Sequence, residues 1–185
     1  MHLSTHGFFF PDPEEIRANF HVEQIAEIDF RGTKIPTQRS IGSSVFLKNK
    51  NPLMRSGLVF AGANQVWNST DFNKGDDGVL TAKEVAAMDL SRSKLVVLSA
   101  CETGLGDIVG TEGVYGLQRA FKMAGAGKIV MSLWKVPDKE TQEFMSIFYS
   151  QLTQNQSVEK AFEIAQNKMR LKYEPYFWAA FVLLN

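Results

Sequence analysis

The sequence predicts an α/β domain with a mostly parallel sheet flanked by helices. Two apolar runs, KLVVLSA (residues 94–100) and KIVMSLW (residues 128–134), lack the polar alternation of a half-exposed strand. Such runs are typical of strands that are covered on both faces. Segments with helical apolar spacing alternate with these strands, which favours a layered α/β arrangement. The 185 residues suffice for one domain with a substantial core.

The N-terminal part predicts short strands. Apolar and polar residues alternate in MHLSTH, so we expect a strand that ends at His6, where Gly7 breaks it. Residues 14–28 have weak helical periodicity. Residues 43–52 and 56–63 each predict a short strand.

Cap signals mark where helices begin. Thr81 and Glu84 have the spacing of a capping box, so a short helix should follow Thr81. Asp138 follows a proline and is expected to cap the next helix. Ser157 is expected to cap a further one, whose apolar face comprises Val158, Ala161, Phe162, Ala165 and Met169.

Two further segments complete the prediction. GVYGLQRAFKMAGAG, from residue 113, should form a helix that ends at a glycine. The aromatic stretch YFWAAFVLL, residues 176–184, should close the chain as a strand.

Composition narrows the classes of partner. Twenty basic and twenty acidic residues give a net charge of zero, which argues against nucleic acid or a membrane surface as a partner. The longest apolar runs, such as residues 177–184, are too short to span a bilayer. Cys101 is the single cysteine and MHLSTHG has no basic leader region, so we expect a reducing, cytoplasmic setting.

Cys101 and His6 are the residues with the clearest catalytic chemistry. Each is predicted at the carboxyl end of a strand, and adjacent parallel strands would place those ends side by side. A cysteine nucleophile needs a nearby base, which a histidine supplies. From these residues alone, two other interpretations stay open: Cys101 as buried packing, and His6 as a structural histidine.

Other motifs do not predict a cofactor or a metal ion. The glycines of GLGDIVG, residues 104–110, have the wrong spacing for a dinucleotide loop. NKGDDGVLTAKE, residues 73–84, resembles a calcium loop but has Gly75 at the third ligand position. We therefore expect no cofactor and no metal site.

Several motifs together resemble the CHAT domain, a caspase-like module often found beside tetratricopeptide arrays. They are THGFF, NPLMRSGLVFAGAN, LSACETGLG, SLWKVPD and YFWAAFVLL, in the family's order. The resemblance implies a caspase–hemoglobinase fold and a cysteine endopeptidase that acts through a thioester acyl-enzyme. It makes His6 and Cys101 the catalytic dyad, and the backbone amides of Gly7 and Cys101 the oxyanion hole. Ser99 matches a position that lines the substrate pocket.

The resemblance also carries expectations about partners. The family's sheet has strands before the one that leads to the histidine, so residues 1–185 are expected to be the C-terminal portion of a CHAT domain. We expect a protein or peptide substrate, and regulation by a tetratricopeptide-containing partner or an attached repeat region. Asp107 and Glu112 follow Cys101 and are further substrate-pocket candidates that would favour a basic substrate residue.

Two alternatives to an endopeptidase follow from the same residues. An open sheet edge would suit a non-catalytic interaction module, or a homo-oligomer that forms through that edge. A small-molecule hydrolase or transferase with the same dyad is the other alternative.

Overall fold

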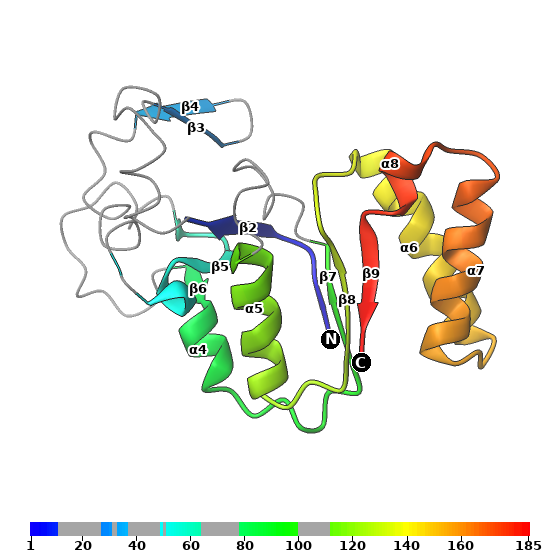
Figure 1. Cartoon of the computed structure of the whole chain (residues 1–185), viewed down its shortest axis with the longest axis horizontal. Coiled ribbons are helices and arrows are strands. Elements are labelled where there is room, and N and C mark those ends of the chain that lie inside the picture. The colour runs from blue at the N-terminus through cyan, green and yellow to red at the C-terminus, as the bar shows by residue number, and fades with distance from the viewer. Residues whose placement is uncertain (11–26, 31–32, 37–48, 50, 64–77, 100–111) are drawn as a thin grey trace.

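The computed structural model describes residues 1–10, 27–30, 33–36, 49, 51–63, 78–99 and 112–185. Its main sheet has four strands in the order β1-β7-β8-β9 (Figure 1). These strands are β1 (His2–Leu3), β7 (Leu95–Leu98), β8 (Lys128–Ser132) and β9 (Phe181–Leu184). β1, β7 and β8 run parallel, and β9 is antiparallel to β8. The predicted mostly parallel α/β sheet is confirmed.

Helices cover both faces of this sheet. α4 (Ala82–Ala86) and α5 (Glu112–Met123) lie on one side, and α6 (Asp138–Thr153) and α7 (Val158–Arg170) on the other (Figure 1). Successive residues of each strand point to opposite faces, so Val96 packs in the first core and Val97 in the second. This explains why residues 95–98 are apolar without alternation.

A second, antiparallel sheet adjoins the first. It has the order β2-β5-β6, with β2 (His6–Phe9), β5 (Ser56–Val59) and β6 (Val79–Thr81). A one-turn helix, η2 (Pro52–Met54), precedes β5. The strands β3 (Glu27–Phe30) and β4 (Thr33–Pro36) form a separate antiparallel pair. A helix over residues 14–28, which the weak periodicity suggested, is therefore wrong for residues 27–28, which lie in β3. Residues 11–26 lie outside the described part of the chain.

The N-terminal strand differs from the prediction. It divides into β1 and β2, and Gly7 lies inside β2 rather than ending a strand. The chain leaves the parallel sheet after Leu3 and pairs with β5 from His6 onward. The Thr5 hydroxyl donates a hydrogen bond to the Val59 carbonyl at this crossing. Alternation alone does not distinguish one strand from two that share a direction.

The helix caps are mostly as predicted. Thr81 and Glu84 form the reciprocal capping box of α4, and the Ser157 hydroxyl accepts from the Lys160 amide at the start of α7. Gly125 follows α5 with φ +91°, a conformation that favours glycine. Asp138 is not a cap: Pro137 holds the cap position and makes no side-chain bond, so Asp138 lies in the first turn of α6.

The C-terminal segment is half helix and half strand. Pro175 starts the short helix α8 (Pro175–Trp178), and β9 begins only at Phe181. A proline suits the first turn of a helix because its missing N–H has no partner there. The single strand predicted over residues 176–184 is therefore wrong in its first half. Most of the strand predicted over residues 43–52 lies outside the described residues.

Candidate functional site

The carboxyl ends of β1 and β7 lie side by side. Leu3 pairs with Leu98, and the Ser99 amide donates to the Leu3 carbonyl at 3.1 Å. The two chain segments that continue from these strands therefore leave the sheet at the same edge. In open α/β sheets this is where functional groups gather.

His6 follows the end of β1 and begins β2. It is partly buried and pairs with Val59 of β5. The backbone position of His6 is thus fixed by the pairing of β1 with β7 before it and by its own pairing with β5. The predicted catalytic histidine sits at the junction of the two sheets.

The Gly7 amide faces away from the only described partner of its strand. Antiparallel pairs alternate between hydrogen-bonded and non-hydrogen-bonded positions. Phe10 donates to the Arg55 carbonyl at 2.8 Å, so Phe8 and His6 take the hydrogen-bonded positions and Gly7 the other kind. Gly7 is also buried. Its N–H is therefore directed to the side of β2 opposite β5, as an oxyanion donor requires.

Several predicted site residues lie where the structure gives no description. Cys101 and Asp107 are outside the described residues, and Glu112 is described only as the first residue of α5. Ser99 follows β7 of the main sheet, whereas His6 and Gly7 lie in β2 of the second sheet, three and four residues after β1 ends.

His2 connects the end of β7 to α6. Its Nε2 lies 2.9 Å from the Ser99 hydroxyl, and its Nδ1 lies 2.9 Å from the Tyr149 hydroxyl. The His2 and Tyr149 rings also stack, with centroids 5.5 Å apart. These contacts tie His2 to the end of β7 and to α6.

Burial controls the protonation of this chain of hydrogen bonds. It lowers the pKa of His2, with a smaller contribution from the positive α-amino group. It raises the pKa of Tyr149. Both side chains are therefore uncharged at neutral pH. A neutral imidazole has one donor and one acceptor, so one of the two hydroxyls donates to His2 and the other accepts.

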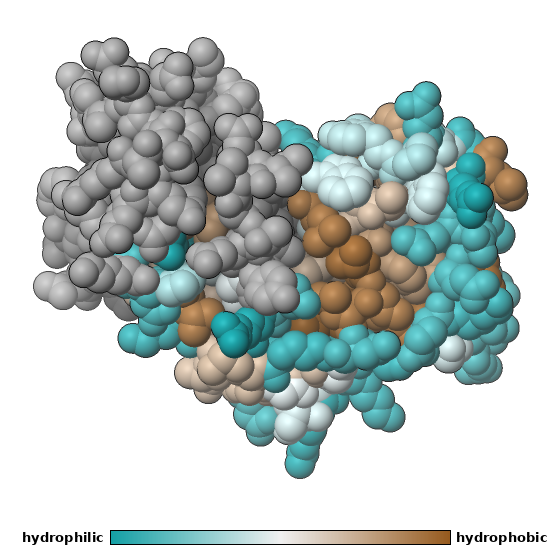
Figure 2. Space-filling view, in the orientation of Figure 1, coloured by the Kyte–Doolittle hydropathy of each residue, from teal (hydrophilic) through white to brown (hydrophobic). Residues whose placement is uncertain are grey.

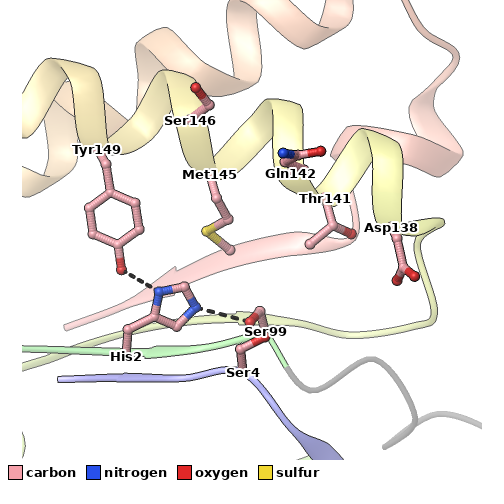
Figure 3. Close-up of a pocket in the computed structure, with 9 residues that line it drawn as sticks. All are labelled: His2, Ser4, Ser99, Asp138, Thr141, Gln142, Met145, Ser146 and Tyr149. Atoms are coloured by element: carbon pink, nitrogen blue, oxygen red, sulfur yellow. Dashed lines mark hydrogen bonds between the residues drawn. The ribbon is translucent and has the colours of Figure 1, made fainter.

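An open pocket lies between α6 and the ends of β1 and β7 (Figure 3). Its volume is about 630 Å³, within the range of ligand sites. The lining residues are mostly polar: His2, Ser4, Ser99, Asp138, Thr141, Gln142, Met145, Ser146 and Tyr149. Ser99 is among these lining residues, and its role in a substrate pocket stays a prediction.

The contribution of α6 to this pocket was missed from sequence. Asp138, Thr141, Met145 and Tyr149 recur at helical spacing along the helix. The adjacent apolar stripe, with Phe144 and Phe148 fully buried, is the stronger signal and packs against the sheet. The polar stripe beside it carried no motif to single it out.

The described residues contain neither a metal-binding cluster nor a membrane-spanning helix. No group of three or more His, Cys, Asp or Glu side chains there is arranged to hold a metal ion. No helix in the described ranges has the length and hydrophobicity to cross a bilayer.

The sequence matches a known family and known proteins. The model of the CHAT domain matches residues 1–185. The chain belongs to the CHAT domain family. The chain is also similar to tetratricopeptide repeat protein 28 of Mus musculus, 34% identical over 111 residues, and to that of Homo sapiens, 33% identical over 111 residues. Each match covers 58% of this chain and 4% of the relative.

Proposed function

We propose that this CHAT domain is a caspase-like cysteine endopeptidase with His6 and Cys101 as its dyad. The observation that carries the proposal is the register of β1 and β7. Paired residues of these strands, His2 with Val97 and Leu3 with Leu98, are 95 positions apart, and so are His6 and Cys101. Each dyad member thus follows its paired strand by the same number of residues. This equal offset favours a meeting of the two side chains at the sheet edge.

The proposed reaction has two halves, formation of a thioester with Cys101 and hydrolysis of that thioester. His6 takes the Cys101 thiol proton, and the thiolate attacks the peptide carbonyl. The amides of Gly7 and Cys101 stabilise the oxyanion of the tetrahedral intermediate. His6 then gives its proton to the leaving amine, and the peptide C–N bond breaks to leave a thioester. Water, deprotonated by His6, hydrolyses the thioester and restores the thiol.

The outward direction of the Gly7 N–H supports the oxyanion hole. Loss of one such donor typically costs on the order of 10²–10³ in kcat. A strand amide already bonded within the ladder would have to break that bond first. Gly7 does not have this cost with respect to β5, because the ladder alternation directs its amide away from that strand.

We place the reaction in the cytoplasm, because a cysteine nucleophile must stay reduced. The relatives are named for tetratricopeptide repeats, which supports control by an attached repeat region or a partner that contains one. The chain matches 4% of the length of these relatives. The rest of each relative is long enough to contain tetratricopeptide repeats.

A peptide-library digest tests the activity. The wild-type chain should cleave, and Cys101→Ala and His6→Ala should each lose cleavage while they keep the wild-type circular dichroism spectrum. Leu171→Ala is the control, because this side chain is 90% exposed and lies outside the pocket lining. Cleavage that persists in Cys101→Ala would refute the assignment.

Among the described strands of the main sheet, β1 lies at an edge, which favours an interaction module as a second candidate. Val97 donates to the Met1 carbonyl and Ser99 to the Leu3 carbonyl, so the backbone of His2 faces away from β7. Figure 2 shows hydrophobic residues exposed in the middle of this view, between the two helix layers. Such an edge invites a strand from another chain, including a second copy.

Sedimentation velocity tests this second candidate. A concentration-dependent dimer that dissociates in His2→Pro, which removes the outward N–H, would support pairing at the β1 edge. A monomer at every concentration, with no partner bound at this edge, would count against it.

A further inference from the structure

We propose that the pocket beneath α6 binds a lysine or arginine side chain of the substrate, the one immediately before the scissile bond. Asp138 supplies the countercharge. The term "scissile bond" rests on the endopeptidase proposed above, whereas binding of a basic side chain in the pocket does not.

The first argument is location. Ser4 lies two residues before His6, and Ser99 two residues before Cys101, and both line the pocket. The pocket therefore opens beside the chain segments that carry the dyad. A substrate residue adjacent to the attacked carbonyl would have its side chain within reach of this opening.

The second argument is charge. Among the described lining residues Asp138 is the one carboxylate, and none is a lysine or an arginine. His2 is uncharged at neutral pH, because burial lowers its pKa. The pocket therefore attracts a cation and offers an acidic side chain no positive partner. Asp138 is exposed at the start of α6, where a ligand can reach it.

The third argument is that the pocket lining has both an apolar part and a polar part. Met145 is 7% exposed and gives the pocket an apolar contact, while the hydroxyls of Ser99, Thr141 and Tyr149 lie around it. Figure 3 shows Asp138 and Thr141 directed from α6 toward the strand ends, with Met145 between Thr141 and Tyr149. Long basic side chains combine an aliphatic stem with a charged end, and so match this arrangement.

Binding of short peptide amides to Cys101→Ala tests the pocket without any catalysis. The peptides end in lysine, in norleucine, which has the same stem without the charge, or in glutamate. NMR titration should give binding up to about fivefold tighter for lysine than for norleucine, the range of an ion pair with an exposed carboxylate. Glutamate should bind no better than norleucine.

A pair of variants then locates the charge. Asp138→Asn should remove the preference for lysine. Glu140→Gln, the same charge change in the same turn of α6 but outside the pocket lining, should keep it. Equal binding of lysine and norleucine, or a preference that survives Asp138→Asn, would overturn the proposal.

The same peptides, made into acyloxymethyl ketones, separate this proposal from the endopeptidase. Labelling of Cys101 that is equally fast for lysine and norleucine would leave the dyad standing and reject the basic pocket. Lysine-selective binding with no labelling at all would reject the dyad and leave the pocket standing.

Discussion

At the residue scale, His2 joins three elements through one side chain. It lies on β1, contacts Ser99 at the end of β7 and stacks on Tyr149 of α6. The neutral ring donates to one of the two hydroxyls and accepts from the other. Protonation would make both nitrogens donors, so both hydroxyls would have to accept.

Acid should therefore weaken the fold through His2. The unfolded chain has a His2 pKa near 6.5, and the folded chain a lower one, so the unfolded state binds more protons between the two values. The contribution to stability is complete above the unfolded pKa and is lost as the pH falls through the folded pKa. Urea unfolding at about pH 7.5 and about pH 5 should show a smaller acid loss in His2→Gln than in wild type. An equal loss in the two proteins would contradict this account of His2.

Gly7 offers a second residue-scale prediction. Replacing its amide with an ester removes the N–H and changes little else. We expect activity to fall on the order of 10²–10³, because an oxyanion donor is lost, with the melting temperature nearly unchanged. The same replacement at Phe8, a hydrogen-bonded position of the β2–β5 pair, should lower the melting temperature. A Gly7 ester that melts early and stays active would reverse the ladder assignment.

The residue types of the dyad could be predicted, whereas the pocket could not. His6 and Cys101 carry reactive chemistry and sit in recognisable motifs, THG and SAC. Tyr149 and Asp138 reach the pocket only because α6 packs on the face of the sheet, beside the ends of β1 and β7. That placement depends on tertiary packing, which no local pattern encodes.

At the element scale, α4 depends on its capping box. The Glu84 amide donates to the Thr81 hydroxyl at 3.2 Å, and the Thr81 amide donates to the Glu84 carboxylate at 2.8 Å. Thr81→Ala should lower the free energy of unfolding by about 1 kcal/mol, measured by urea denaturation.

A double-mutant cycle tests whether the two bonds act together. Glu84→Ala combined with Thr81→Ala should cost less than the sum of the two single changes, because the Thr81 hydroxyl also donates to Glu84 at 2.7 Å. Simple additivity would mean that the two bonds stabilise α4 independently.

The attachment of α6 depends on one aromatic side chain. Phe144 is 0% exposed and stacks on Phe181 of β9 at 4.0 Å. It also meets the edge of Phe162 of α7 at 5.6 Å. Phe144→Ala should cost about 3–5 kcal/mol in urea denaturation, because it leaves a cavity among three elements. Leu171→Ala, at a side chain 90% exposed, should stay within about 0.5 kcal/mol of wild type; a comparable loss in both would contradict this packing.

Element prediction succeeded where one physical signal dominated. β7 and β8 are apolar on both faces, and α7 has both a cap and an apolar stripe. It failed at Gly7, which lies inside a strand, and at Pro175, which starts a helix. The structure of each segment depends on the element that it packs against. Those partners are far away in sequence, so local alternation is compatible with either outcome.

At the scale of the whole molecule, two sheets share the N-terminal segment. β1 completes the parallel sheet, and β2 completes the antiparallel one. His6 therefore occupies the junction, and the end of β7 leads to Cys101 from the adjacent strand. The layered fold was predictable from alternating strands and helices. The division of one segment between two sheets was not, because it follows from long-range pairing.

The rate of Cys101 alkylation tests the central claim most directly. Cys101 is the single cysteine, so iodoacetamide incorporation followed by intact mass reports on it alone. If His6 holds the thiol as a thiolate, alkylation at mildly acidic pH should be much faster in wild type than in His6→Ala, and Leu171→Ala, at an exposed side chain outside the pocket, should stay near wild type. Equal rates in wild type and a folded His6→Ala would contradict the dyad.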